Sequence, residues 1–365
     1  MRWKKFLVLA TLLLLAGKGY GASFEPISFP SLVSTLRNLD SLEFCGEPVP
    51  LEIQEVRERL EKELLLAIWD RPQVILWLKR SRRYLPQIEK MLQQNKMPDD
   101  LKYLAIAESA LRPHVGSKKG AIGFWQFMED TGRNYGLVIN EYVDERRSFF
   151  ASTRAAILYL ADLHNLLESW TLSAAAYNMG EQGLQAEIMM QETSDYYRLY
   201  LPLETQRFIF RILSVKLILS NPANYGFILT DEDYYYTLSH DQINIDCLQE
   251  IPILIIAQAA ETDFKIIKDL NPELRGHYLT TGNHNILIPK GTSGGFHARY
   301  TRLAKDYLEA RKERIYVVRD GDNLSSIASQ FDIPLEALIM WNRLELNNVL
   351  HPGDRLIIFP KQKNN

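Results

Sequence analysis

The sequence has little of several features that would assign a function directly. Its 365 residues include only two cysteines, Cys45 and Cys247, and seven histidines that form no metal-ligand cluster. A net charge of −3 gives no overall basic surface for nucleic acid. We therefore expect no metal, no cofactor and no nucleic-acid partner. Two cysteines allow at most one disulfide, and the sequence leaves open whether they pair or stay as free buried thiols.

The apolar run at the N-terminus is shorter than a typical membrane span of about 20 residues. Arg2, Lys4 and Lys5 precede this run, which covers residues 6–16 and is followed by small residues. Positive charge before a short apolar run is typical of an export signal. We therefore interpret residues 1–22 as a signal peptide and expect an exported protein of the periplasm or cell envelope. The alternative is an uncleaved segment that associates with the membrane.

Glu108 is the residue that most strongly suggests chemistry. The Pro-Asp-Asp sequence at 98–100 predicts a helix start, and Leu104 and Glu108 then fall on one face of that helix. The helix is apolar nearly all round, so we expect it to be buried. Burial raises the pKa of a carboxyl group and keeps a proton available for general acid catalysis. The alternative is a structural glutamate paired with an arginine such as Arg112.

The segment that follows Glu108 lacks a second carboxylate. From Ser109 to Met128 there is no Asp or Glu, whereas ordinary glycosidases use two carboxylates about 5–10 Å apart. The segment instead has glycines suited to tight turns, an indole face suited to a sugar ring at Trp125 and an amide at Gln126. A structural turn with a core tryptophan would look the same. Folding could also bring in an acid from further along, and the candidates are Glu129, Asp130 and Asp144.

A third motif, Ala-Tyr-Asn-Met-Gly at 176–180, completes a set that resembles the family 1 lytic transglycosylases. These goose-lysozyme-like enzymes cut peptidoglycan. Their Glu-Ser pair is matched by Glu108 and Ser109, and a later serine by Ser117. Their Gly-x-x-Gly-x-[Trp/Met]-Gln-x-Met motif is matched by Gly120, Gly123, Trp125, Gln126 and Met128. Their Ala-Tyr-Asn-x-Gly motif is matched by Ala176, Tyr177, Asn178 and Gly180.

A fourth motif of this family, Glu-Thr-x-x-Tyr, is matched only in part. Glu204 and Thr205 are present, but Phe208 stands where the family has tyrosine. The missing hydroxyl puts one minor contact in doubt. Many relatives are lipoproteins with a cysteine directly after the signal, whereas the first cysteine here, Cys45, lies too far downstream for us to expect lipidation.

The resemblance implies a specific mechanism. Glu108 would protonate the bond between N-acetylmuramic acid (MurNAc) and N-acetylglucosamine (GlcNAc) and would then act as a base, giving a 1,6-anhydro product without water. Ser117 and Gln126 would hold sugar groups, and Tyr177 and Asn178 would position Glu108 and the substrate. The full predicted substrate-binding set is Ser109, Ser117, Gly123, Trp125, Gln126, Met128, Tyr177 and Asn178. The alternatives are a lysozyme-like hydrolase and an inactive peptidoglycan-binding protein.

The last third of the chain contains a repeat at an offset of 71 residues, without gaps. For example, the Leu-Asn pair at 270–271 aligns with Trp-Asn at 341–342, and Gly282 aligns with Gly353. The second copy reads as strand, helix, helix, strand and resembles LysM, a module that binds GlcNAc-containing glycans. The first copy lacks the entry turn and looks like a degenerate LysM.

The resemblance places the glycan contacts of LysM in two loops. The corresponding residues here are Gly321, Asp322, Asn323, Leu324, Asn347 and Leu350. Their alternative role is turn formation and helix capping, which Gly, Asp and Asn also favour. We expect Asn342 to be a structural cap.

These observations predict a mainly α protein, α+β overall, with a lysozyme-like helical catalytic domain followed by a degenerate and a complete βααβ LysM module. Its length and its 46% hydrophobic residues allow two or three domains with real cores. We expect a monomer whose partner is the peptidoglycan glycan strand. The predicted segments are 1–22 signal peptide, 23–96 N-terminal helical extension, 97–228 catalytic domain, 229–290 degenerate LysM-like module, 291–313 linker and 314–362 LysM domain.

Overall fold

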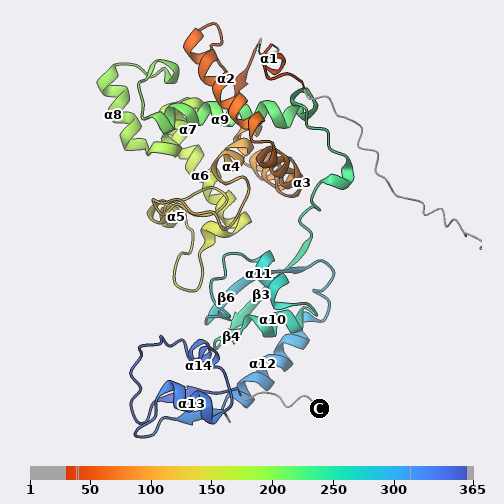
Figure 1. Ribbon diagram of the computed structural model, residues 1–365, viewed down its shortest axis with the longest axis vertical. Coiled ribbons are helices and arrows are strands. Elements are labelled where there is room, and N and C mark those ends of the chain that lie inside the picture. Colours follow the sequence, from red (N-terminus) through yellow and green to blue (C-terminus); the bar gives the residue numbers. More distant parts are fainter. Residues whose placement is uncertain (1–29, 38, 40, 313, 360–365) are drawn as a thin grey trace, which may run out of the picture.

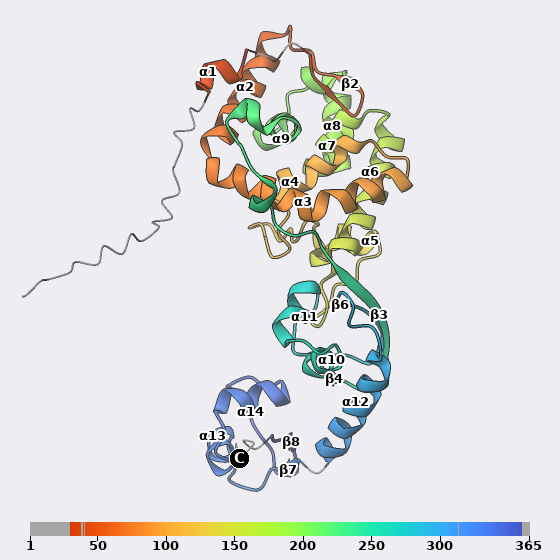
Figure 2. The ribbon, with the colours of Figure 1, turned by 90° about the vertical axis from the view of Figure 1, so that its right-hand side faces the viewer.

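The computed structural model describes residues 30–37, 39, 41–312 and 314–359. The predicted signal peptide lies outside these residues. The chain forms an elongated molecule with a large helical part at one end, a small mixed part in the middle and a second small part at the other end (Figures 1 and 2). The prediction of a mainly α fold is confirmed, because in the described ranges helices dominate and the strands form only two-stranded sheets.

The helical part contains one continuous buried core that runs from Leu39 to Phe227. Helix α4 lies inside it, packed between α3 and α9, and α7 packs on both α6 and α9. The boundary expected at residue 96 therefore does not divide the core, since α2 and α3 share it with the later helices. The helices and strands of this part are α1 (Leu32–Thr35), β1 (Glu43–Phe44), β2 (Glu47–Pro48), α2 (Gln54–Trp69), α3 (Arg71–Gln94), α4 (Lys102–Ser109), α5 (Glu129–Asn134), α6 (Phe149–Leu167), α7 (Trp170–Met179), α8 (Glu181–Gln191) and α9 (Leu203–Ser220).

Short 3₁₀ helices join several of these elements. Each covers three or four residues, as is usual for this tighter helix. They are η1 (Asp99–Leu101), η2 (Glu145–Arg147), η3 (Tyr196–Arg198), η4 (Pro222–Tyr225) and η5 (Asp231–Asp233).

The middle part is built on an antiparallel pair, β3 and β6, in which Gln242 lies opposite Leu287. In β3, Ile243, Ile245 and Cys247 are buried and alternate with exposed residues, as expected for a strand with one face on a core. Helices α10 and α11 cover that face and complete the core. The elements are β3 (His240–Cys247), β4 (Ile251–Pro252), α10 (Ile253–Ala259), α11 (Phe264–Leu270), β5 (Tyr278–Leu279), β6 (Gly282–Pro289) and α12 (Phe296–Lys312).

The described residues of the C-terminal part repeat the strand, helix, helix, strand order without counterparts of β4 and β5, and this part has a third core of its own. Its strands pair antiparallel, with Ile315 opposite Ile357. The elements are β7 (Ile315–Val317), α13 (Leu324–Gln330), α14 (Leu335–Asn342) and β8 (Arg355–Ile357).

Two asparagines hold equivalent positions in the two copies. The Asn271 amide donates to the carbonyls of Ile267 and Leu287 and accepts from the Leu287 N–H. The Asn342 amide donates to the carbonyls of Leu338 and Ile357 and accepts from the Ile357 N–H. Each therefore ties the second helix to the last strand, as the expected structural role of Asn342 requires. The asparagine lies 16 residues before its partner on the last strand in the first copy and 15 residues before it in the second. The second copy is therefore one residue shorter in this region, and the ungapped offset of 71 does not extend to the last strand.

The segment between the copies is more ordered than its Gly- and Ser-rich sequence suggests. The Asp241 carboxylate accepts hydrogen bonds from Gly291 and Ser293 and pairs with Lys290. Helix α12 then packs against α10, with Phe296 fully buried. Asp241 therefore supplies the acceptor that the backbone at the start of the predicted linker needs.

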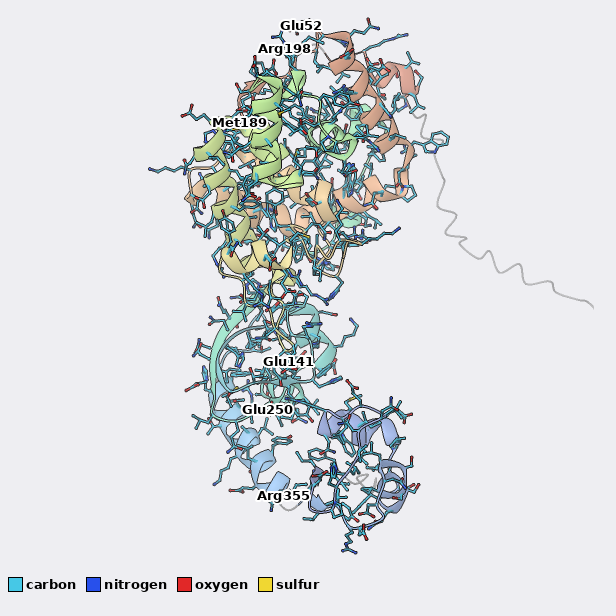
Figure 3. All side chains as sticks on the ribbon, turned by 90° about the vertical axis from the view of Figure 1, so that its left-hand side faces the viewer. Glu52, Glu141, Met189, Arg198, Glu250 and Arg355 are labelled. Atoms are coloured by element: carbon cyan, nitrogen blue, oxygen red, sulfur yellow. The ribbon has the colours of Figure 1, made fainter. Side chains whose placement is uncertain are left out.

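A loop of the helical part touches the middle part. The backbone of Val143 pairs with Leu274, and the Asp144 N–H donates to the Glu273 carbonyl at 2.9 Å. Figure 3 shows Glu141, on the same loop, beside the middle part. Cys45 and Cys247 belong to different parts and are both free thiols. Within the described residues, no helix has the length and apolar character needed to cross a membrane.

Candidate active site

Glu108 lies at the end of α4, directly before a sharp change of chain direction. Ala110 and Leu111 both adopt left-handed backbone conformations, with φ of 53° and 57°. This conformation costs about 1–2 kcal/mol for a residue with a side chain. The Leu111 side chain is 1% exposed, so its burial offsets part of that cost. The turn leaves Glu108 half-buried at the edge of a cavity.

The cavity has a volume of about 570 Å³ and brings together the three sequence motifs. One wall is the segment from Ser117 to Thr131, and another is the end of α7 with Tyr177 and Asn178. Glu108 faces both walls from α4. Segments far apart in the sequence therefore meet at the carboxyl group that the sequence indicated.

The electrostatic environment of Glu108 favours its protonated form. Burial raises its pKa from 4.5 to about 8, the nearby Arg211 guanidinium opposes the rise, and the Glu204 carboxylate adds to it. Among the residues that the structure describes, no hydrogen bond or ion pair engages the Glu108 carboxyl. Arg112, the partner expected for a structural role, donates instead to the Ser109 carbonyl at 3.1 Å.

The cavity contains carboxylates other than Glu108. Glu181, at the start of α8, and Glu204, in the first turn of α9, also line the cavity. Both are already engaged: the Tyr159 hydroxyl donates to Glu181 at 3.0 Å, and Arg211 pairs with Glu204 at 3.1 Å.

The three acids that sequence order suggested do not line this cavity. Asp144 is buried in an ion pair with Arg146, Glu129 pairs with Arg133 at the surface, and Asp130 is exposed. The acids that reach the cavity come from helices later in the chain.

Four of the predicted substrate-binding residues line the cavity with polar atoms. The Gln126 amide nitrogen donates to the carbonyls of Val115 and Gly123, which directs this side chain while its Oε1 has no partner within the described ranges. The Ser117 hydroxyl accepts from the Ala121 N–H at 3.0 Å. Asn178 accepts from the Thr205 hydroxyl at 2.9 Å, which connects two of the motifs. The fourth is Tyr177, considered next.

Tyr177 holds the loop rather than Glu108. Its hydroxyl donates to the Trp125 carbonyl at 2.7 Å. Burial raises its pKa well above the ordinary value, and the Glu108 charge adds to the effect, so the phenol stays protonated and remains a donor. Met128 lines the cavity with its apolar side chain, 44% exposed.

Three residues predicted to bind substrate do not line the cavity. Trp125 is fully buried, and its indole N–H donates to the Thr153 hydroxyl, so it offers no face to a sugar. Ser109 is 2% exposed and donates to the Phe124 carbonyl at 2.7 Å. A Cβ on Gly123, which has a φ of 90°, would lie 1.8 Å from the Arg146 carbonyl oxygen. These residues build the loop and do not face the ligand space.

Other residues of the site were missed in the sequence. Lys118 and Lys119 line the cavity between two motif residues, and Tyr159 lines it from α6. Arg146 lies behind the loop and donates to the carbonyl of Gly120. The two lysines lie between Ser117 and Gly120, which match the family motifs, and this position could have indicated them. No nearby motif in the sequence indicated Tyr159 or Arg146.

The two predicted LysM loops border a second, shallow cavity of about 380 Å³. Asp322, Asn323, Leu324 and Leu350 line it, whereas Gly321 and Asn347 do not. The alternative role of these loop residues, in turn formation and helix capping, also has support. Asn323 caps α13 through the Ser326 N–H, and Asp322 accepts from the Tyr316 hydroxyl and the Arg319 N–H. The structure therefore gives these two residues a turn role and leaves a ligand role untested.

Comparison with known proteins adds family models and relatives. Residues 86–199 match the model of the transglycosylase SLT domain, and residues 316–359 match that of the LysM domain. The chain is 30% identical to membrane-bound lytic murein transglycosylase D of Escherichia coli strain K12, over 94% of this chain and 78% of that protein. The same protein from Escherichia coli O6:H1 matches equally.

A third relative is similar over a shorter region. The putative tributyltin chloride resistance protein of Alteromonas sp. strain M-1 is 30% identical over 29% of this chain and 53% of its own length. The two domain models match in order along the chain, and the likeness to transglycosylase D covers nearly all of it. The chain therefore belongs to the lytic murein transglycosylase family, with an SLT domain followed by a LysM domain.

Proposed function

We propose that this protein is a peptidoglycan lytic transglycosylase that cleaves the β-1,4 bond between MurNAc and GlcNAc, with Glu108 as general acid and then base. The observation that carries the proposal is the state of Glu108. It is half-buried in the cavity, unpaired among the described residues, and has a pKa raised to about 8. Such a group holds a proton near neutral pH and can release it to a bound glycosidic oxygen.

In the first half of the reaction, the Glu108 proton moves to the glycosidic oxygen and the bond from that oxygen to C1 of MurNAc breaks. The electron pair stays with the GlcNAc oxygen, which leaves as a hydroxyl. Positive charge develops at C1, and the oxygen of the sugar's own 2-acetamido group stabilises it. Glu108 ends this half as a carboxylate.

In the second half, that carboxylate takes the proton of the MurNAc C6 hydroxyl and O6 attacks C1. A 1,6-anhydro bond forms and Glu108 regains its proton, so no water is consumed. The attack is intramolecular and gains from proximity as long as water is kept out. One group that serves as acid and base accounts for both halves.

Polar atoms around the cavity fit the sugar substituents. The Gln126 amide oxygen has no partner in the described part of the chain and can accept a hydrogen bond from a sugar, and the Ser117 hydroxyl lies at the same wall. Asn178 is directed by Thr205. We assign these three side chains to the sugar hydroxyl and acetamido groups. An inactive glycan-binding protein is disfavoured because Glu108, Gln126 and Tyr177 are all intact.

A hydrolase on the same scaffold is the second candidate, and the additional cavity carboxylates are what favours it. A hydrolase needs a base that activates water, and Glu181 or Glu204 would have to fill that role. Both already accept hydrogen bonds, from Tyr159 and Arg211 respectively. Glu108 has no such partner among the described residues, so we assign both proton transfers to it and prefer the transglycosylase.

The LysM domain is proposed to bind the same glycan. A weak binder tethered to an enzyme raises the local concentration of substrate. Deleting residues 314–365 should weaken binding to insoluble sacculi and spare activity on short soluble chains. Unchanged sacculus binding would refute this role. The same proposal includes residues 1–22 as an export signal or, alternatively, as an uncleaved segment that associates with the membrane. Either role fits an enzyme of the cell envelope.

Mass spectrometry of muropeptides released from purified peptidoglycan tests the reaction. We expect products that end in anhydroMurNAc, lighter by one water than hydrolytic products. The Glu204→Gln variant is the matched control, since it keeps the shape of a cavity residue and removes its charge. Reducing-end products that disappear in Glu204→Gln would establish the hydrolase instead.

A further inference from the structure

A tight turn displays two lysines at the mouth of the cavity that contains Glu108. Within it, the Gly120 N–H donates to the Ser117 carbonyl at 3.0 Å, and the Ser117 N–H donates to the Ala121 carbonyl at 2.8 Å. Lys118 and Lys119 are the two residues at its tip, and both line the cavity. The turn fixes the backbone positions from which the two lysine side chains extend.

A buried ion pair supports this turn from behind. The Arg146 guanidinium pairs with Asp144 at 2.8 Å and donates to the Gly120 carbonyl at 3.1 Å. The side chains of Arg146 and Asp144 are 5% and 1% exposed. The two lysines are therefore presented by a braced loop, although their own side chains are exposed.

The charges of the cavity are unequally compensated. Glu204 is neutralised by Arg211 and Glu108 holds its proton near neutral pH, whereas Glu181 accepts from the neutral Tyr159 hydroxyl and keeps its negative charge. Lys118 and Lys119 make no ion pair with any other residue in the described parts of the chain. The mouth of the cavity thus offers two cations to an anionic ligand.

We propose that Lys118 and Lys119 recognise the carboxylate on the branch of the muramic acid sugar and so favour anionic glycan strands over neutral ones. This rests on the proposed function. The glycan backbone is uncharged, and the branch on MurNAc is where its negative charge lies. In peptide-free strands the lactyl carboxylate is exposed, and in peptide-bearing strands the stem peptide supplies the carboxylates.

Exposed ion pairs are individually weak, so the expected effect is modest. Typical exposed pairs correspond to about 1.4- to 5-fold each, and two together give roughly 2- to 25-fold. The loss should appear in KM because the lysines bind the branch in ground and transition states alike. Added salt should reduce the difference in KM between the wild type and a variant without these lysines, because salt screens exposed charges.

The test compares full-length wild type with the Lys118→Gln/Lys119→Gln double variant on three substrates. These are peptide-bearing strands, amidase-stripped strands with free lactyl carboxylates, and stripped strands whose carboxyls have been amidated. We expect kcat/KM to fall roughly 2- to 25-fold on one or both anionic substrates, with little change on the amidated strands. Which anionic substrate is affected identifies the source of the carboxylate. The Lys62→Gln/Lys90→Gln variant, at two exposed lysines elsewhere, controls for net charge.

Equal loss on amidated and anionic strands would overturn the proposal, because it would mean that the lysines support the loop. No change on any substrate would also overturn it. The identity of the product is measured in the same reactions. Reducing-end products would reject the proposed transglycosylase while leaving the preference for anionic strands a separate result.

Discussion

Replacing Glu108 by Gln should abolish activity and stabilise the protein at the same time. Glutamine keeps the size of the side chain but carries no ionisable proton. Loss of a general acid–base group typically costs about 10²–10⁴ in rate, and here one group serves both halves of the reaction. The gain in stability follows from the raised pKa of Glu108, because the unfolded chain ionises this carboxyl more readily than the folded protein does.

The gain in the free energy of unfolding depends on pH. With a pKa of 4.5 unfolded and about 8 folded, the folded state binds an extra proton between these values. The wild-type free energy of unfolding therefore loses its Glu108 contribution as pH rises from 4.5 to about 8. At pH 7 the loss is about 3 kcal/mol, from about 1.4 kcal/mol per pH unit. The Gln variant has no such loss, so it should match wild type near pH 4.5 and exceed it by about 3 kcal/mol at pH 7.

Denaturant unfolding at pH 4.5 and pH 7 measures this difference, with activity on purified peptidoglycan measured in parallel. By thermal unfolding, about 3 kcal/mol corresponds to a rise of roughly 6–12 °C for a domain of this size. Glu58→Gln, at an exposed position on α2, is the control and should change neither stability nor activity. Equal stability of wild type and Glu108→Gln at both pH values would show that Glu108 is not desolvated. Substantial turnover by the variant would show that the acid lies elsewhere.

Three further predictions concern the site and its supports. The pH profile of kcat/KM should decline as pH rises through about 8, because Glu108 then loses the proton it must donate; activity that keeps rising to pH 9.5 would contradict this. Gly123→Ala should destabilise the protein by about 4 kcal/mol or more, as seen in denaturant unfolding, since the new Cβ meets the Arg146 carbonyl; wild-type stability would contradict the close approach. Asn342→Ala should cost the LysM domain about 2–3 kcal/mol, because it removes the amide that bonds the backbone of Leu338 and Ile357. Hydrogen exchange in β8 measures that loss, and unchanged protection there would contradict it.

The parts of the account that sequence could predict are those encoded locally. Glu108 was found because a carboxyl on an apolar helix is anomalous wherever that helix lies. The second copy of the repeat was found because strand and helix periods are local. Its one-residue shortening was missed because only the Asn271 and Asn342 contacts to the last strands reveal which residues are equivalent.

The errors arose where orientation depends on tertiary contacts. Trp125 and Gln126 are neighbours, yet one is fully buried and the other lines the cavity. The left-handed conformation of Gln126, with a φ of 50°, helps to separate them, and no residue type there signals it. Glu204 reaches the cavity because α9 packs on α4, a contact between segments about 100 residues apart in the sequence. Pattern reading could not supply that proximity.

The fate of solvent oxygen tests the central claim most directly. Purified peptidoglycan would be digested by the wild-type enzyme in ¹⁸O-labelled water, and the new termini analysed by mass spectrometry. Ring closure by the C6 hydroxyl predicts anhydroMurNAc ends that contain no ¹⁸O. Incorporation of one labelled oxygen at each new MurNAc end would mean that water is the nucleophile, and Glu181 or Glu204 would then have to be the base that activates it.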